Sequence, residues 1–197
     1  MRLNRRDFLK PLGAAVVARL VPGQAVAQTG VPHAEKLPVT PFDAPEGTWS
    51  LAVFPDTQNL TRSAPEVLRR QCEWVVAHRE KHALRFVMQL GDITDINSVA
   101  EWENARQAFR ILRDGGVPFS LLPGNHDLGK GGAAEDRTTL MNDYFTPDDY
   151  RNSQSHGLFE AGRMENSWHT LDTPWGKFLL IALEFGPRDA VLEWAGE

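Results

Sequence analysis

Three short polar clusters in this sequence combine residue types that can hold divalent cations and transfer protons. They are Asp56-Thr57-Gln58, Gly91-Asp92-Ile93-Thr94-Asp95 and Gly124-Asn125-His126-Asp127. Carboxylate and amide oxygens are ligands for hard cations such as Mg²⁺ and Mn²⁺, and an imidazole can act as a general acid or base. Taken singly, each cluster is also compatible with a turn or a helix cap.

The apolar segments before these clusters favour a common location for them. Residues 51–54, 86–90 and 118–122 are predicted strands, and each ends just before one cluster. The intervals of 36 residues from Asp56 to Asp92 and 33 from Asp92 to Asn125 each fit one crossover helix. Because the carboxyl ends of parallel strands meet at one sheet edge, we expect the clusters to converge there. A turn at each position would not predict that coincidence.

Capping signals predict the two crossover helices. Ser63 and Glu66 form a capping-box pattern before a helix that runs to about residue 82, with Pro65 in its first turn. Ser98 and Glu101 repeat the pattern before a helix that ends near Gly115. The alternation predicts an α/β domain with a parallel sheet.

The remaining sequence predicts smaller elements. Residues 128–137 form a Gly-rich loop, 140–145 a short helix, and a polar loop continues through residue 157. Strands over 168–171 and 178–183 are joined by a turn over 173–176, and Pro187 can open a final helix. Lys130 and Arg137 could contact a phosphate, although solvated loop charges are the ordinary interpretation. Cys72, the single cysteine, is expected to be a buried, inert thiol.

In their order and intervals, the three clusters resemble the signature blocks of the calcineurin-like metallophosphoesterases. That family shows Asp-x-His or Asp-x-Gln, then Gly-Asp-x-x-Asp, then Gly-Asn-His-Asp or Gly-Asn-His-Glu. The resemblance covers roughly residues 49 to 195, and residues 183–189 with Glu193-Trp194 are similar to a branch of secreted bacterial members. It implies a calcineurin-like fold, an α/β/β/α sandwich, and hydrolysis of a phosphate-ester substrate.

The resemblance also implies a ligand set for two divalent metal ions. Asp56 and Gln58 would bind the first metal, Asp92 would bridge both, and Asn125 would bind the second. Gln58 stands where many family members have a histidine. Because an amide oxygen is a harder ligand than an imidazole, Mn²⁺, Fe or Mg²⁺ is favoured over Zn²⁺.

Two further residues receive catalytic roles from the same resemblance. His126 would stabilise developing charge or protonate the leaving oxygen. Asp95 would orient His126 and raise its basicity, with a turn or helix cap as the alternative.

The family completes its site with a strand-end histidine and a Gly-His-x-His block, neither of which occurs in this chain. Residues 49–197 are therefore expected to be the N-terminal portion of a truncated metallophosphoesterase domain, incomplete at its C-terminus. A complete, shortened enzyme that uses His156 or His169 instead is the alternative. His78 and His82 are four residues apart and could bind a metal, but an exposed polar face is the simpler interpretation.

The N-terminal 27 residues are typical of an export signal. Arg5-Arg6 precedes Asp7-Phe8-Leu9-Lys10, an apolar run follows, and Ala25-Val26-Ala27 offers a cleavage site. This pattern predicts transient use of the twin-arginine export machinery and a periplasmic or secreted protein; an amphipathic helix is the alternative. Residues 28–48 contain four prolines and are expected to form a linker.

Charge and hydropathy narrow the range of partners. Residues 1–27 carry five Arg or Lys and one Asp, and removing that +4 from the chain's −5 leaves −9. A protein with this negative charge is expected to bind nucleic acid poorly without a specific site. No run of 18 apolar residues occurs, so no permanent membrane span is expected.

Three functional hypotheses follow from these observations. The first is an exported dinuclear metallophosphoesterase, and the second is a catalytically inactive binding module that keeps the fold. The third is an unrelated α/β domain that binds a sugar or a nucleotide, but the chain has no Gly-x-Gly-x-x-Gly or P-loop sequence.

Overall fold

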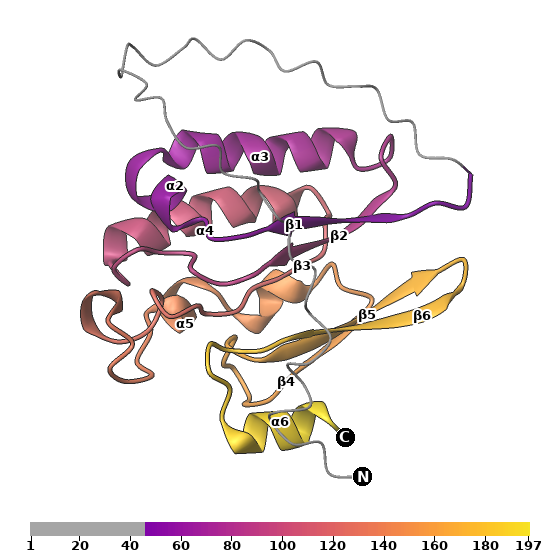
Figure 1. Cartoon of the computed structure of the whole chain (residues 1–197). Helices are drawn as coiled ribbons and strands as arrows, with labels where there is room; N and C mark the ends of the chain where they lie inside the picture. Colours follow the sequence, from indigo (N-terminus) through magenta and orange to yellow (C-terminus); the bar gives the residue numbers. More distant parts are fainter. Residues whose placement is uncertain (1–45) are drawn as a thin grey trace, which may run out of the picture. The chain divides into compact units, whose positions relative to one another are not determined.

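Three parallel strands form the first sheet in the computed structural model, which describes residues 46–197 (Figure 1). They are β1 (Ser50–Phe54), β2 (Leu84–Gln89) and β3 (Phe119–Ser120), in the order β1-β2-β3. The parallel register pairs Val53 with Met88, and Met88 with Ser120. All three predicted strands and their parallel pairing are confirmed, although β3 is shorter than the predicted segment.

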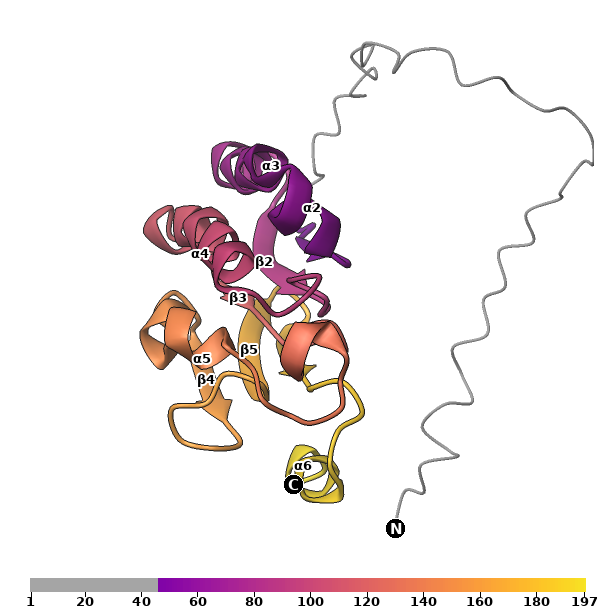
Figure 2. The same ribbon diagram turned by 90° about the vertical axis from the view of Figure 1, so that its left-hand side faces the viewer.

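The crossovers between these strands are helical, as predicted. Helices α2 (Gln58–Ser63) and α3 (Pro65–His78) connect β1 to β2, and α4 (Val99–Asp114) connects β2 to β3. Figures 1 and 2 show α3 and α4 side by side on one face of the sheet. Their buried faces supply much of the core, which includes Trp102 and Phe109.

The predicted capping box at Ser63 is wrong. A helix that was not predicted, α2, takes Ser63 as its last residue, and the N-cap of α3 is Ala64 without a side-chain cap. Because Pro65 disfavours helical backbone at the residue before it, Ala64 breaks the chain into two helices, with φ −148° and ψ 55°. The helix α3 also ends at His78 rather than near residue 82. The chain turns before β2, where Leu84 N donates to Arg79 O at 2.7 Å.

The capping box of α4 is confirmed. The Ser98 side chain accepts a hydrogen bond from Glu101 N at 3.4 Å, and the Glu101 carboxylate accepts one from Ser98 N at 3.3 Å. The helix ends at Asp114 and is followed by Gly115 as its C-cap. This fixes the helix start close to the loop that carries Asp92 and Asp95.

A second, antiparallel sheet lies against the open face of the first (Figure 1). It contains β4 (Ser155–Leu158), β5 (Ser167–Thr173) and β6 (Gly176–Ala182), in the order β4-β5-β6. Strand β4 falls in the predicted polar loop, so that expectation is wrong there. Its Gly157 lies beneath the Trp168 ring, where a Cβ would come within 2.5 Å of Nε1. The predicted turn between β5 and β6 is confirmed, since Thr173 Oγ1 donates to Gly176 O at 2.8 Å.

Short elements complete the described chain. They are the 3-10 helices η1 (Lys130–Gly132) and η2 (Pro147–Tyr150), and the α-helices α5 (Met141–Tyr144) and α6 (Asp189–Ala195). The last of these begins two residues after Pro187 and lies on the outer side of the second sheet (Figure 1). The layers therefore run helix, sheet, sheet, helix, in a mixed α/β arrangement with one parallel and one antiparallel sheet.

The described residues, 46–197, belong to one compact unit. Cys72 is fully buried within it, and burial, followed by the nearby Glu73 charge, raises the pKa of its thiol to about 12. The expectation of a buried cysteine is confirmed, and the raised pKa disfavours the reactive thiolate. The predicted signal peptide, residues 1–27, and all but the end of the predicted linker lie outside the described residues. Within residues 46–197, no helix combines the length and hydropathy that a membrane crossing requires.

Candidate functional site

Hydrogen bonds place the three polar clusters beside one another at the carboxyl edge of the parallel sheet. Leu90 N donates to Phe54 O at 3.0 Å, which joins the ends of β1 and β2. The hydroxyl of Thr57 lies 3.5 Å from Ile93 O, and that of Thr61 donates to the same carbonyl at 2.7 Å. Asp56 and Gln58 flank Thr57, and Asp92 precedes Ile93, so the first two clusters are neighbours as predicted.

Two glycines allow the second and third clusters to pack backbone against backbone. A Cβ on Gly91 would lie 2.8 Å from both Cα and N of Gly124. A Cβ on Gly124 would lie 2.1 Å from Asp92 Oδ1 and 2.2 Å from Asp92 N. Both distances are far below a normal carbon contact of about 3.5 Å. The Gly-Asp and Gly-Asn-His-Asp sequences therefore begin with glycine because no side chain fits between them.

Asp127 links the same two clusters through its buried carboxylate. Its Oδ2 accepts hydrogen bonds from Ile93 N and Gly124 N, both at 2.9 Å. Its Oδ1 accepts from Thr94 N at 2.7 Å and from Thr94 Oγ1 at 2.8 Å. Burial raises the pKa of Asp127 to about 6, while these four hydrogen bonds act in the opposite direction by favouring the anion. The side chain is fully buried, so it fixes the loops that carry Asp92 and Asn125.

No role for Asp127 could be predicted from the sequence. Its position at the end of Gly-Asn-His-Asp was visible, but the long-range donors that it collects were not. The only local signal was an aspartate three residues after a glycine, which an ordinary turn would explain equally well.

The four predicted metal ligands keep oxygen atoms available. Asp56 is exposed, and within residues 46–197 its carboxylate makes no hydrogen bond or ion pair. The Oε1 of Gln58 is buried and has no hydrogen-bond partner among the described residues. Asp92 accepts one hydrogen bond, from His126 N to Oδ1 at 3.0 Å, and the Asn125 side chain makes none in the described part of the chain. A buried amide oxygen without a hydrogen-bond partner could accept a bond from a ligand, such as a cation or a water molecule.

The backbone at Asp92 is also unusual. Its φ of +48° lies in the left-handed region, which aspartate adopts more readily than most residues but at some cost in energy. The conformation lets Oδ1 reach the amide of His126 while the loop passes directly over Gly124. Strained residues of this kind concentrate at functional sites.

His126 is oriented by the backbone rather than by a carboxylate. Its Nδ1 lies 2.7 Å from Asp95 O, whereas the nearest oxygen of the Asp95 carboxylate lies 3.7 Å away. The carbonyl contact, opposed by partial burial and assisted by the charges of Asp92, Asp95 and Asp127, raises the pKa of His126. With Nδ1 donating to the carbonyl, Nε2 makes no hydrogen bond among the described residues.

The carboxylate of Asp95 instead forms an ion pair with Arg62 on α2. Arg62 was not among the predicted site residues, because helix α2, which carries it, was not predicted. Asp95 therefore contacts His126 mainly through its main chain and Arg62 through its side chain.

The described residues contain no cluster of three or more His, Cys, Asp or Glu side chains placed to hold a metal ion. The predicted set has two carboxylates, from Asp56 and Asp92, and two amides, from Gln58 and Asn125. Oxygen donors of this kind match Mg²⁺ or Mn²⁺ in type, but two carboxylates are few for tight binding.

Two other histidines of the described chain, His169 and His78, do not add to these donors. Both ring nitrogens of His169 face hydroxyls, with Ser153 Oγ 3.0 Å from Nδ1 and Ser167 Oγ 3.1 Å from Nε2. Burial, with a smaller effect of His156, lowers the pKa of His169 to about 3. His169 is therefore a neutral core residue between the sheets, in contact with the Phe86 ring. On α3, the His78 ring stacks on Trp74 at a centroid distance of 4.7 Å, and its Nδ1 lies 2.8 Å from Trp74 O.

A polar network borders the candidate site on the side of β6. Phe185 N donates to Pro123 O at 2.9 Å, which attaches the segment after β6 to the segment after β3. The buried carboxylate of Glu184 accepts from Arg188 Nε at 2.8 Å and lies 3.2 Å from Arg137 Nη1. Burial alone would raise the pKa of Glu184, but hydrogen bonds from Arg188 and Asn166 and the charge of Arg137 lower it. Arg137 is thus engaged with this segment.

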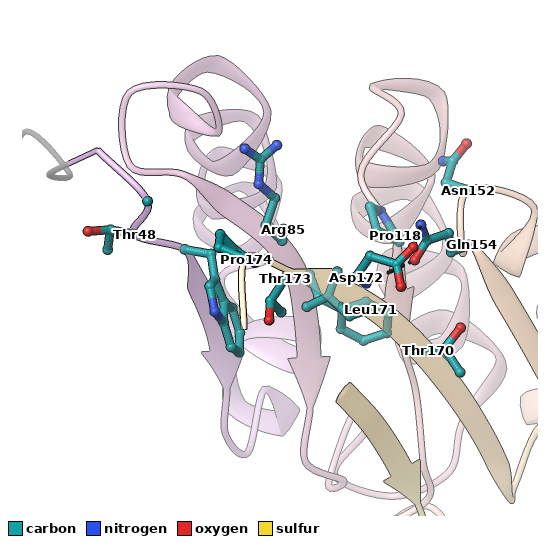
Figure 3. Close-up of a pocket in the computed structure, with 13 residues that line it drawn as sticks. Thr48, Arg85, Pro118, Asn152, Gln154, Thr170, Leu171, Asp172, Thr173 and Pro174 are labelled. Atoms are coloured by element: carbon teal, nitrogen blue, oxygen red, sulfur yellow. Dashed lines mark hydrogen bonds between the residues drawn. The ribbon is translucent and has the colours of Figure 1, made fainter. Parts of the chain in front are cut away.

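A cavity lies at the opposite end of the parallel sheet. It has a volume of about 600 Å³ and is lined by residues next to the amino ends of the strands, including Thr48, Arg85 and Pro118 (Figure 3). Strand β5 supplies its other wall through Thr170, Leu171 and other residues. The candidate site at the carboxyl edge is therefore separate from this cavity.

Comparison with models of known protein families finds no match. The chain is similar to the uncharacterized protein YvnB of Bacillus subtilis (strain 168), with 24% identity over 147 residues. The matched stretch covers 72% of this chain and 11% of the Bacillus protein, so the chain spans a small part of that relative's length. Similarity at this level does not assign the chain to a family.

Proposed function

We propose that the carboxyl edge of the parallel sheet is part of the active site of a metal-dependent phosphoesterase with a calcineurin-like fold. The observation that carries the proposal is the buried Oε1 of Gln58, which has no hydrogen-bond partner among the described residues. Gln58 is the first residue of α2, and Thr57 and Thr61 hold this helix start against the Asp92 loop. The order of helix, sheet, sheet and helix supports the fold. Export by the twin-arginine route to the periplasm or the medium belongs to the same proposal.

The donor set fits two divalent cations that prefer oxygen ligands. Asp56 and Gln58 would hold one cation, Asn125 the other, and the two carboxylate oxygens of Asp92 suit a bridging position. Mn²⁺, Fe or Mg²⁺ is favoured over Zn²⁺ because no imidazole or thiolate belongs to the set. Bound there, the cations would supply an activated water and neutralise charge on a phosphoryl group.

The protein's own groups would position and protonate the substrate. The contact of Nδ1 with Asp95 O orients the His126 ring, so that Nε2 would donate a proton to a leaving oxygen. The Asp95 carbonyl contact, assisted by the charges of Asp92, Asp95 and Asp127, raises the pKa of His126, which favours the protonated ring. Because Asp127 and the two glycines fix the loop of His126 against that of Asp92, the acid and the metal ligands keep a constant spacing.

The test is hydrolysis of bis-p-nitrophenyl phosphate by the purified chain with Mn²⁺, compared with Mg²⁺ and Zn²⁺. Wild type should be active with Mn²⁺, and Asp92→Asn should lose about 100-fold or more in kcat/KM because a neutral amide cannot bridge two cations. Asp148→Asn is the control, since Asp148 is exposed and pairs only with nearby Arg151 in the described chain. Equal activity of Asp92→Asn and wild type would refute the proposed role.

A catalytically inactive binding module is the second candidate. It is favoured by the absence of a cluster of three His, Cys, Asp or Glu ligands in the described residues. This alternative predicts no hydrolysis with any of the three cations, but Mn²⁺ binding, measured by electron paramagnetic resonance, that Asp92→Asn weakens.

A further inference from the structure

Arg62 lies on α2 one helical turn after the predicted ligand Gln58. Residues four apart share one helix face, so the two side chains project from the same side of α2. The buried end of Gln58 faces the protein, whereas the Arg62 side chain is 58% exposed. Arg62 is therefore placed at the rim of the candidate site rather than within it.

Asp95 fixes the position of Arg62 relative to His126. One carboxylate oxygen, Oδ2, pairs with Arg62 Nη1, and the other, Oδ1, lies 3.7 Å from His126 Nδ1. His126 in turn donates its backbone amide to Asp92 Oδ1 at 3.0 Å. A continuous series of contacts thus connects the guanidinium to the imidazole and to the predicted bridging carboxylate.

Most of the hydrogen-bonding capacity of Arg62 is unused. A guanidinium has five N–H donors, and within residues 46–197 only Nη1 makes a hydrogen bond, to Asp95. Arg137, by contrast, is committed to the carbonyls of Phe185 and Gly186 and to the Glu184 carboxylate. An exposed ion pair such as Arg62–Asp95 adds little to stability, so its location beside His126 is the informative feature.

We propose that Arg62 binds a non-bridging phosphate oxygen of the substrate and makes the site prefer phosphomonoesters to phosphodiesters. The inference rests on the proposed phosphoesterase function. A monoester dianion presents one more unsubstituted, negatively charged oxygen than a diester. A planar guanidinium with free donors is suited to that oxygen, whereas the second ester group of a diester offers it a weaker acceptor.

The experiment compares p-nitrophenyl phosphate with bis-p-nitrophenyl phosphate in Mn²⁺-loaded wild type, Arg62→Ala and Arg62→Lys. Arg110→Ala is the matched control, because Arg110 is 63% exposed and also pairs with an aspartate, Asp114. Arg62→Ala should raise KM for the monoester about tenfold, the lower range for a charge-assisted hydrogen bond that solvent screens. The diester parameters should change less than about twofold, and Arg62→Lys should recover part of the monoester KM.

A second readout separates this inference from the proposed function. Binding of inorganic phosphate is measured by calorimetry for the same four proteins, with and without Mn²⁺. If wild type hydrolyses neither ester, the proposed function fails, and weaker phosphate binding by Arg62→Ala alone still supports the anion site. Equal loss of kcat on both esters would show that Arg62 only holds Asp95, which overturns the inference. Unchanged KM, or phosphate binding that is absent or unaffected by the substitution, overturns it as well.

Discussion

Replacement of Gly124 by alanine tests whether close packing between the loops that begin at Gly91 and Gly124 sets the geometry of the site. The Cβ of an alanine would lie 2.1 Å from Asp92 Oδ1 and 2.2 Å from Asp92 N. Asp92 N is a backbone atom, and Asp92 Oδ1, an atom of the predicted metal ligand, already accepts a hydrogen bond from His126 N. Neither can rotate away without disturbing the site.

The size of the effect follows from these distances. To reach a normal contact of about 3.5 Å, the two loops must separate by roughly 1.3 Å near Asp92. Metal sites tolerate about 0.2 Å in ligand distances, and a misplacement of about 1 Å can lower a rate about 100-fold. We therefore expect kcat/KM for bis-p-nitrophenyl phosphate to fall by about two orders of magnitude. Overpacking should also lower the free energy of unfolding by about 1–3 kcal/mol.

Gly196→Ala is the matched control for this variant. The φ of Gly196 is −91°, and a Cβ there would meet its nearest neighbour at an ordinary 3.4 Å. Activity, Mn²⁺ affinity and urea unfolding are measured for both variants and wild type. If Gly124→Ala keeps wild-type activity and Mn²⁺ affinity, the spacing of Asp92 from the third cluster does not control the site, and the reasoning is refuted.

Two further predictions concern stability. His169 has a folded-state pKa of about 3, below its unfolded value of about 6.5, so its contribution to stability is complete above pH 6.5 and is lost as pH falls toward 3. Urea unfolding should show that wild type loses about 2 kcal/mol more than His169→Gln between pH 7.5 and pH 5; parallel pH profiles would contradict this. Asp127→Asn should lower the free energy of unfolding at pH 7.5 by about 3 kcal/mol, because an amide NH₂ would face backbone N–H donors that now meet a carboxylate oxygen. A loss below about 1 kcal/mol would show that those donors find other acceptors.

The part of the fold that organises the candidate site could be predicted because its signals are local. Apolar runs give β1, β2 and β3, and Ser98 with Glu101 gives the start of α4. Parallel topology then places the three strand ends at one edge without any knowledge of side-chain contacts. The same logic failed at Ser63, where the pattern of a capping box is present but Pro65 imposes a break one residue later.

Contacts that depend on tertiary structure could not be predicted in this way. Asp127 gathers donors from residues 33 and 34 positions away, and Arg62 reaches Asp95 across 33 positions. Neither pairing leaves a periodic or local trace in the sequence. Strand β4 was missed because its four residues, Ser155–Leu158, include Gly157 and lack a run of β-branched or aromatic residues. Its pairing with β5 is what makes it a strand.

The contrast between bonded and unbonded groups is the strongest structural argument for a ligand at this edge. In the loops after β2 and β3, the carboxylate of Asp127 accepts four hydrogen bonds, and two glycines allow backbone contact. Within the same small region, the buried amide oxygen of Gln58 has no partner among the described residues, and Asp92 keeps a left-handed backbone. An unpaired buried oxygen and a left-handed aspartate each cost about 1–3 kcal/mol, and a cation bound at this edge would offset that cost. Rigid support around unpaired acceptor oxygens is what a preorganised cation site requires.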